Sequence, residues 1–177
     1  FPPPPLPAVY SLNVPIPGAV ERLAADLHPH FTAFDRIRDR HYIVCKRFEA
    51  DESEYDHLRE RLRIALSPTP AFEARITGID AFETPTHGSG PVVYLAVESP
   101  GLHDLHRRLV ETFGAVHEEL EGSAYVPHVT LARGGAAADA ERLREMEVDP
   151  VTWTVSELDL WSRARREAVW SVSLPRP

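Results

Sequence analysis

"YVPHVTLAR", residues 125–133, is the segment from which the fold and the chemistry of this chain can be predicted together. It is rich in valine, threonine and tyrosine, which are frequent in β-strands, so it predicts a strand. Side chains two positions apart share one face of a strand, about 6.6 Å from each other. His128 and Thr130 therefore lie side by side, and Pro127 indicates an edge or irregular strand beside a groove.

Arg133 ends the same segment, and it would point to the other face of a regular strand. The adjacent Gly134 and Gly135 permit a bulge that would bring it beside His128. A histidine can take or give a proton near neutral pH, and a threonine hydroxyl can donate to a phosphoryl oxygen. The segment could thus be half of a phosphate site, although a lone strand histidine is more often a core or rim residue.

Apolar periodicity extends the prediction on both sides of this segment. Further strands are predicted at 9–17, 41–48, 71–83, 91–99, 151–163 and 168–175, and helices at 18–31, 51–67, 101–114 and 134–148. The order of elements is nearly repeated from residue 92 onward. This repeat predicts an α+β fold of two similar lobes, each an antiparallel-type sheet with outer helices, around a central cleft.

A length of 177 residues suits a single domain, which we place at residues 9–177. We expect residues 1–8, with four consecutive prolines, to be a disordered tail outside the fold. Cys45 is the only cysteine, so we expect no internal disulfide and a reducing cytoplasmic setting. The sequence has neither an apolar run of about 18 residues nor a signal-like leader, so we expect no membrane span.

The net charge of −8 argues against a broad nucleic-acid-coating surface but not against a local basic groove. The basic residues are nearly all arginines, since Lys46 is the only lysine. Arg36, Arg38 and Arg40 stand at alternate positions. They could line an RNA groove or, equally, form a salt-bridged surface.

The 125–133 segment resembles the second signature of the 2H phosphoesterase superfamily, the 2′-5′ RNA ligase-like proteins, which reads Pro-His-x-Thr-aliphatic followed by Arg. "YSLNVPIPGAVERL" at 10–23, "PVVYLAV" at 91–97 and "TVSELDLWSR" at 154–163 also resemble segments of this family. The resemblance covers most of residues 9–174.

The family carries two such signatures, one in each lobe, facing each other across the cleft. The first should lie in "DRHYIVCKRF", residues 39–48, where His41 matches the histidine but Ile43 replaces the hydroxyl residue. A rival triplet, "HFT" from His30 to Thr32, lies at a helix end and lacks the aliphatic continuation. We favour His41 over His30.

We expect a cytoplasmic monomer, and the mechanism that the resemblance implies needs no metal or cofactor. It would cleave phosphodiesters on RNA ends or small nucleotides with a 2′,3′-cyclic phosphate, or reversibly join 2′-5′ bonds. His41 and His128 would be the acid and base, and Thr130 and Arg133 would hold the non-bridging oxygens. Because Ile43 departs from the signature, a non-catalytic module that binds nucleotides or RNA ends remains an alternative. A metal-dependent hydrolase is a third.

Three other features are predicted to be structural. His103 and His106 lack a third metal ligand, so we expect them to face solvent. The acids of "HEELEG", residues 117–122, suit a solvated turn, and Cys45 lacks the surroundings of a nucleophile.

Overall fold

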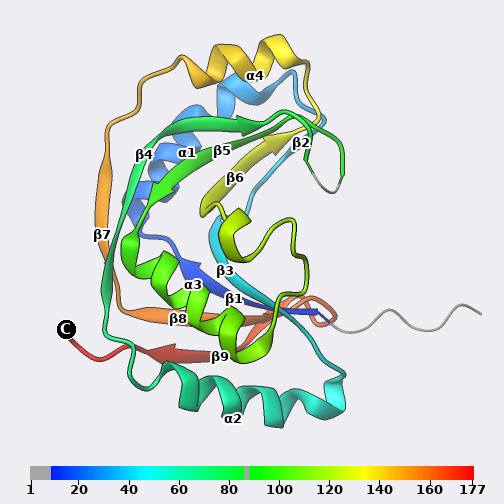
Figure 1. Ribbon diagram of the computed structural model, residues 1–177. Coiled ribbons are helices and arrows are strands. Elements are labelled where there is room, and N and C mark those ends of the chain that lie inside the picture. Colours follow the sequence, from blue (N-terminus) through cyan, green and yellow to red (C-terminus); the bar gives the residue numbers. More distant parts are fainter. Residues whose placement is uncertain (1–8, 86–87) are drawn as a thin grey trace, which may run out of the picture.

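The computed structural model describes residues 9–85 and 88–177, so the tail predicted at 1–8 lies outside the described residues. One antiparallel sheet runs through the described part, with helices beside it (Figure 1). Its strands are β1 (Val9–Pro15), β2 (Arg36–Ile37), β3 (Tyr42–Glu49), β4 (Phe72–Phe82), β5 (Val92–Glu98), β6 (His128–Arg133), β7 (Val151–Val155), β8 (Glu157–Ser162) and β9 (Glu167–Ser173). The helices are α1 (Gly18–Leu27), α2 (Tyr55–Leu66), α3 (Pro100–Phe113) and α4 (Ala137–Arg144), with 3-10 turns η1 (His28–Phe31), η2 (Glu52–Glu54) and η3 (Gly122–Ala124).

The strand order is symmetric about the centre of the sheet. It reads β7-β4-β5-β6-β3-β1-β8-β9, with the short β2 paired to β6. Two four-stranded lobes therefore meet where β6 lies beside β3, and Ile43 pairs with Val129 at this seam. The predicted α+β fold with two similar antiparallel lobes is confirmed, with the two lobe sheets joined into one curled sheet.

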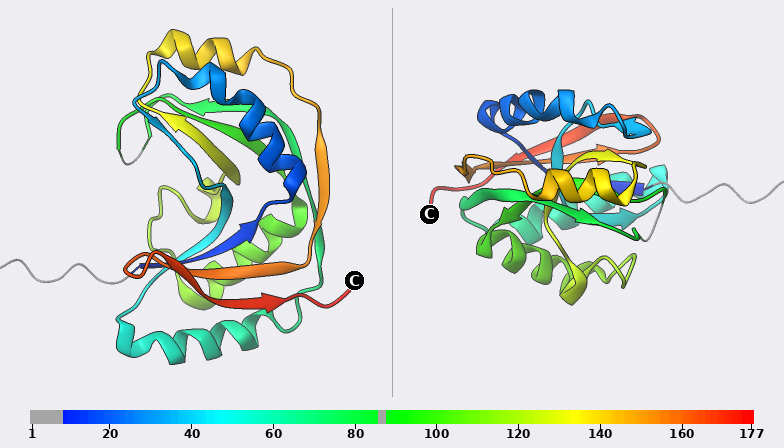
Figure 2. Two further views of the ribbon diagram at one scale, coloured as in Figure 1. Left: turned by 180° about the vertical axis from the view of Figure 1, so that it is seen from behind. Right: turned by 90° about the horizontal axis from the view of Figure 1, so that it is seen from above.

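Amphipathic helices cover the sheet from both sides. Seen from above, α1 and α3 lie on opposite sides of the strands (Figure 2). Helix α3 buries Leu102, Leu105 and Leu109, whose spacing gives one apolar stripe. Its first turn is capped by the Ser99 hydroxyl, which accepts a hydrogen bond from the backbone N–H of Leu102, and it ends at Gly114, where φ is +80°.

The single strand predicted at 151–163 is two strands in the structure. β7 pairs with β4 in one lobe, while β8 pairs with β1 in the other. The chain crosses between the lobes at Ser156, whose carbonyl accepts a hydrogen bond from the backbone N–H of Leu174. Apolar residues alternate at odd positions up to Val155 and at even positions from Leu158, so the alternation changes phase at the crossing. Among the described residues, no helix is both long and apolar enough to cross a bilayer.

Candidate active site

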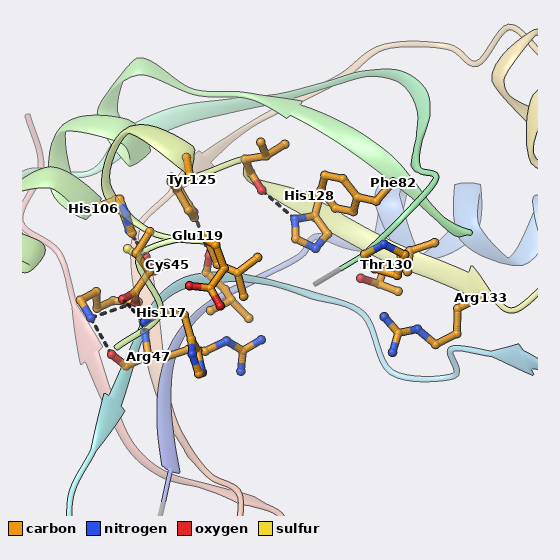
Figure 3. A pocket seen from close by; sticks show the side chains of 18 of the residues that line it. Cys45, Arg47, Phe82, His106, His117, Glu119, Tyr125, His128, Thr130 and Arg133 are labelled. Atoms are coloured by element: carbon orange, nitrogen blue, oxygen red, sulfur yellow. Dashed lines mark hydrogen bonds and ion pairs between the residues drawn. The ribbon is translucent and has the colours of Figure 1, made fainter. Parts of the chain in front are cut away.

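Strand β6 presents His128 and Thr130 to a cavity of about 390 Å³ at the seam of the lobes (Figure 3). Val129 and Leu131, which alternate with them, are fully buried in the core. The β5–β6 pairing shifts register around Leu131, so one extra β6 residue is accommodated there. This bulge brings Arg133 to the cavity side, where it lines the cavity with the other two.

The His128 ring is fixed in one orientation and one tautomer. Its Nδ1 lies 2.7 Å from the carbonyl oxygen of Val126, and since a carbonyl only accepts, Nδ1 carries the proton. Nε2 then holds the lone pair. The rings of Phe82 and Tyr94 pack around the imidazole, each with its centroid 5.2 Å from it. Burial lowers the pKa of His128, and Arg47 and Arg38 lower it further, so the imidazole is neutral at pH 7.

Strand β3 presents Tyr42 and Val44, not His41 and Ile43, to the cleft. A pocket beside the main cavity is lined by Tyr42 and Val44 together with His128 and Thr130. Ile43 is fully buried on the core side. The register predicted from the signature is therefore corrected by one residue, which in a strand moves every side chain to the opposite face.

The structure does not bring His41 and His128 together. His41 lies just before β3, and its Nδ1 is 3.0 Å from the Glu21 carboxylate on α1. Neither His41 nor His30 is among the described residues that line the cavities containing His128. His30 is exposed in η1. A catalytic role of His41 thus has no geometric support from the cleft.

Arginines gather around the same cleft. Arg38, Arg47 and Arg133 line the main cavity, and within the described residues none of them forms an ion pair with a carboxylate. The Nε atom of Arg133 is buried and has no hydrogen-bond partner among residues 9–85 and 88–177. Burial lowers the pKa of Arg133, and repulsion from Arg38 and Arg36 adds to this.

Of the alternate arginines, Arg38 and Arg40 line the groove formed by the main cavity and the pocket beside it. Arg36, Arg38 and Arg40 are also without ion pairs in the described part of the chain. Unpaired like charges held close together repel one another, and an anion between them would relieve this repulsion. The groove is therefore suited to phosphate groups.

The loop between α3 and β6 closes one end of the cavity. Glu121, on this loop, is buried and lies 2.9 Å from the Lys46 ammonium group. It also accepts hydrogen bonds from the backbone N–H groups of Arg47, Val116 and His117. The prediction of a solvated turn at 117–122 is wrong for Glu121, because its carboxylate organises the loop from within.

The prediction that His106 faces solvent is also wrong. His106 is buried, and its Nδ1 donates to the Cys45 carbonyl oxygen at 2.7 Å. Its Nε2 accepts from the backbone N–H of Gly122 at 2.9 Å, and Tyr125 stacks on the ring. His106 is therefore a structural residue in the cavity wall. Burial raises the pKa of the Cys45 thiol to about 12, so this buried cysteine stays protonated.

Among the described residues, no group of three or more His, Cys, Asp or Glu side chains gathers as a metal site requires. Sequence reasoning missed several lining residues, among them Tyr42, Val44 and Arg47. Tyr42 and Val44 would follow from placing the signature one residue later, onto "YIVC". No sequence motif marks Arg47 as a residue of the site.

The fold is that of a 2H phosphoesterase. The family model of the 2'-5' RNA ligase superfamily matches residues 20–167, so the chain belongs to this superfamily. No curated protein sequence is similar enough to count as a match.

Solved structures share the fold over nearly the whole chain. TT0787 of Thermus thermophilus is 20% identical, with a TM-score of 0.62 over 95% of this chain and 98% of that one. E. coli LigT complexed with 3'-AMP is 15% identical, with a TM-score of 0.66 over 95% and 98%. E. coli LigT complexed with phosphate is 19% identical, with a TM-score of 0.60 over 97% and 100%.

Proposed function

We propose that the protein is a metal-independent phosphodiesterase acting on 2′,3′-cyclic phosphates of RNA ends or small nucleotides. The observation that carries this proposal is that His128, Thr130 and Arg133 share one cavity with Arg38 and Arg47, two arginines that form no ion pair with any described carboxylate. Family membership supports the reaction class. The complexes of E. coli LigT with 3'-AMP, ATP and NADP+ support nucleotides as the ligand class.

In the proposed reaction, the Nε2 lone pair of His128 takes a proton from the attacking water. The Thr130 hydroxyl and the Arg133 guanidinium donate to the non-bridging oxygens, where negative charge develops. Burial of His128 keeps the imidazole neutral and ready to act as a base. If a ribose 5′-hydroxyl attacked the same cyclic phosphate in place of water, the 3′ oxygen would leave and a 2′-5′ diester would form, so ligation would use the same groups with another nucleophile.

Hydrolysis of a 2′,3′-cyclic mononucleotide in the presence of a chelator tests this proposal. We expect turnover to a monophosphate that the chelator does not affect and that His128→Ala lowers by at least about 10²-fold. Loss of turnover on chelation would instead indicate a metal-dependent hydrolase. An RNA with a cyclic phosphate end, compared with the mononucleotide, shows which of the two is the better substrate.

A second candidate function is a binding module for phosphorylated nucleotides or RNA ends. The observation that favours it is that β3 places Tyr42 and Val44, rather than a histidine and a hydroxyl residue, opposite β6. Such a module would bind a nucleotide phosphate without turnover. Wild type and His128→Ala would then show equal, near-background hydrolysis while calorimetry still detects binding.

A further inference from the structure

Tyr42 and His128 occupy equivalent positions in the two lobes of the sheet. Ile43 pairs with Val129, and the strand order is symmetric about this pair. A two-fold axis through the pair relates Tyr42, one residue before Ile43, to His128, one residue before Val129. Both side chains line the pocket beside the main cavity, which we call the small pocket. Tyr42 therefore reaches the cleft from the lobe opposite His128.

The hydrogen bond of Tyr42 leaves its own proton available to a ligand. Arg38 Nη1 lies 3.1 Å from the phenolic oxygen, and a guanidinium can only donate, so the oxygen accepts this bond. The positive charge of Arg38 beside the oxygen also stabilises negative charge that develops on it. Since the Arg38 bond occupies a lone pair, the O–H group can donate to an atom bound in the pocket.

Neighbouring side chains hold the Tyr42 ring in place. The Arg40 guanidinium lies 5.0 Å from the centroid of Tyr42 and 3.3 Å from that of Trp161. Arg40 thus sits against both aromatic rings, a contact that stabilises a fixed ring orientation. Trp161 belongs to β8, so this strand fixes the position of the Arg40 guanidinium.

An in-line displacement at phosphorus needs a base on the attacking side and an acid on the leaving side. Among the described residues lining the small pocket, His128 and Tyr42 are the side chains from opposite lobes whose groups serve as general acids or bases in enzymes. Arginine does not release its proton, and Val44 has none to give. Tyr42 is thus the lining residue placed to serve the leaving group.

We propose that Tyr42 is the second catalytic residue of the cleft and protonates the leaving ribose oxygen. This inference rests on the proposed phosphodiesterase function. The water oxygen bonds to phosphorus, the water proton passes to His128 Nε2, the bond from phosphorus to the leaving oxygen breaks, and that oxygen takes the phenolic proton. The imidazolium proton then returns through solvent to the phenolate, so the net reaction adds one water to the diester.

Comparing two leaving groups tests this role. The substrates are a 2′,3′-cyclic nucleotide, whose alkoxide must be protonated, and a nucleoside nitrophenyl phosphodiester, whose nitrophenolate leaves as a stable anion. We expect Tyr42→Phe to lower kcat on the cyclic nucleotide by about 10²-fold or more, but on the nitrophenyl ester by less than about threefold. Tyr42→His should restore kcat on the cyclic nucleotide to within about tenfold of wild type, because an imidazolium can also donate a proton.

Tyr55→Phe is the matched control, because its hydroxyl bonds the Val169 carbonyl away from the cleft. It should leave both rates unchanged. If Tyr42→Phe lowers both rates equally, or neither, the proton-donor role is wrong while the phosphodiesterase proposal stands. The proton-donor role of Tyr42 is also wrong if His117→Gln, at another lining residue, gives the leaving-group dependence instead. If wild type hydrolyses neither substrate, the phosphodiesterase proposal fails and the role of Tyr42 fails with it.

Discussion

Lys46 and Glu121 form a buried ion pair, with the ammonium nitrogen 2.9 Å from the carboxylate. Their side chains are 0% and 5% exposed, respectively, so neither charge is compensated by bulk water. Burial alone would raise the pKa of Glu121, but the hydrogen bond and charge of Lys46 lower it below its ordinary value. The pair ties the loop that closes the cavity to β3, beside Arg47.

Removing one member of this pair should destabilise the protein strongly. Lys46→Met leaves Glu121 buried and uncompensated, which costs about 3–5 kcal/mol of unfolding free energy. Chemical denaturation measures this loss, and the double change Lys46→Met with Glu121→Leu should recover much of it. Arg107→Met, which breaks an exposed pair with Asp104, is the control and should cost less than about 1 kcal/mol. Equal costs for the buried and exposed variants would contradict the structural role.

Stability should fall as the pH drops below 6.5, in part through His106. Burial lowers the pKa of His106, and the hydrogen bond to the Cys45 carbonyl and the negative charge of Glu121 do not fully offset it. Below 6.5 the unfolded chain therefore binds a proton that the folded chain resists, so this stabilisation is complete above 6.5 and is lost on acidification. Denaturation midpoints between pH 7.5 and pH 5 check this, and His106→Asn should flatten the profile. An unchanged slope in that variant would rule out His106 as a source.

The two sequence-predicted histidines should differ sharply in their effect on turnover. His128→Ala should lower hydrolysis by at least about 10²-fold, because its neutral imidazole lies in the cleft. His41→Ala should change it by less than about threefold, since His41 contacts Glu21 instead. Rates are measured on variants shown to be folded by circular dichroism. A large loss in His41→Ala would restore the two-histidine mechanism.

Phosphate affinity should depend on Arg133. A charge-assisted hydrogen bond contributes about 1.5–3 kcal/mol, so Arg133→Met should weaken phosphate binding by roughly 10- to 150-fold. Calorimetric titration with inorganic phosphate measures the change. Arg142→Met, at an exposed arginine paired with Asp139, provides the comparison and should leave the affinity unchanged. Undiminished binding by folded Arg133→Met would remove Arg133 from the site.

A hydroxyl added to β3 should help only at the residue that faces the cleft. Val44→Thr places a donor opposite His128 and should raise turnover by about fivefold, which corresponds to one hydrogen bond of about 1 kcal/mol. Ile43→Thr buries an unsatisfied hydroxyl in the core and should instead cost about 1–3 kcal/mol of stability. Steady-state rates and denaturation curves of both variants separate these effects. Faster turnover in Ile43→Thr would show that the signature register was assigned correctly from sequence.

The β6 half of the site could be predicted from sequence because its residues are consecutive and chemically distinct. His128, Thr130 and the bulge before Arg133 all follow from one strand pattern. The β3 half could not, because "YIVC" contains no polar alternation to show which face is buried. Pairing of Lys46 with Glu121 joins residues 75 positions apart, and no local pattern reports such a contact.

The symmetric strand order also bears on how such a sheet can arise. β4 follows α2 in the chain yet lies in the lobe of β5, and β8 follows α4 yet lies beside β1. The first half of the chain thus contributes β4 to the other lobe and the second half contributes β8 and β9, as two subunits do when they exchange arms. A duplicated and fused ancestor of half this length would give that arrangement. Fusion frees the copies to diverge, so one half can keep His128 while the other carries Tyr42 at the equivalent place.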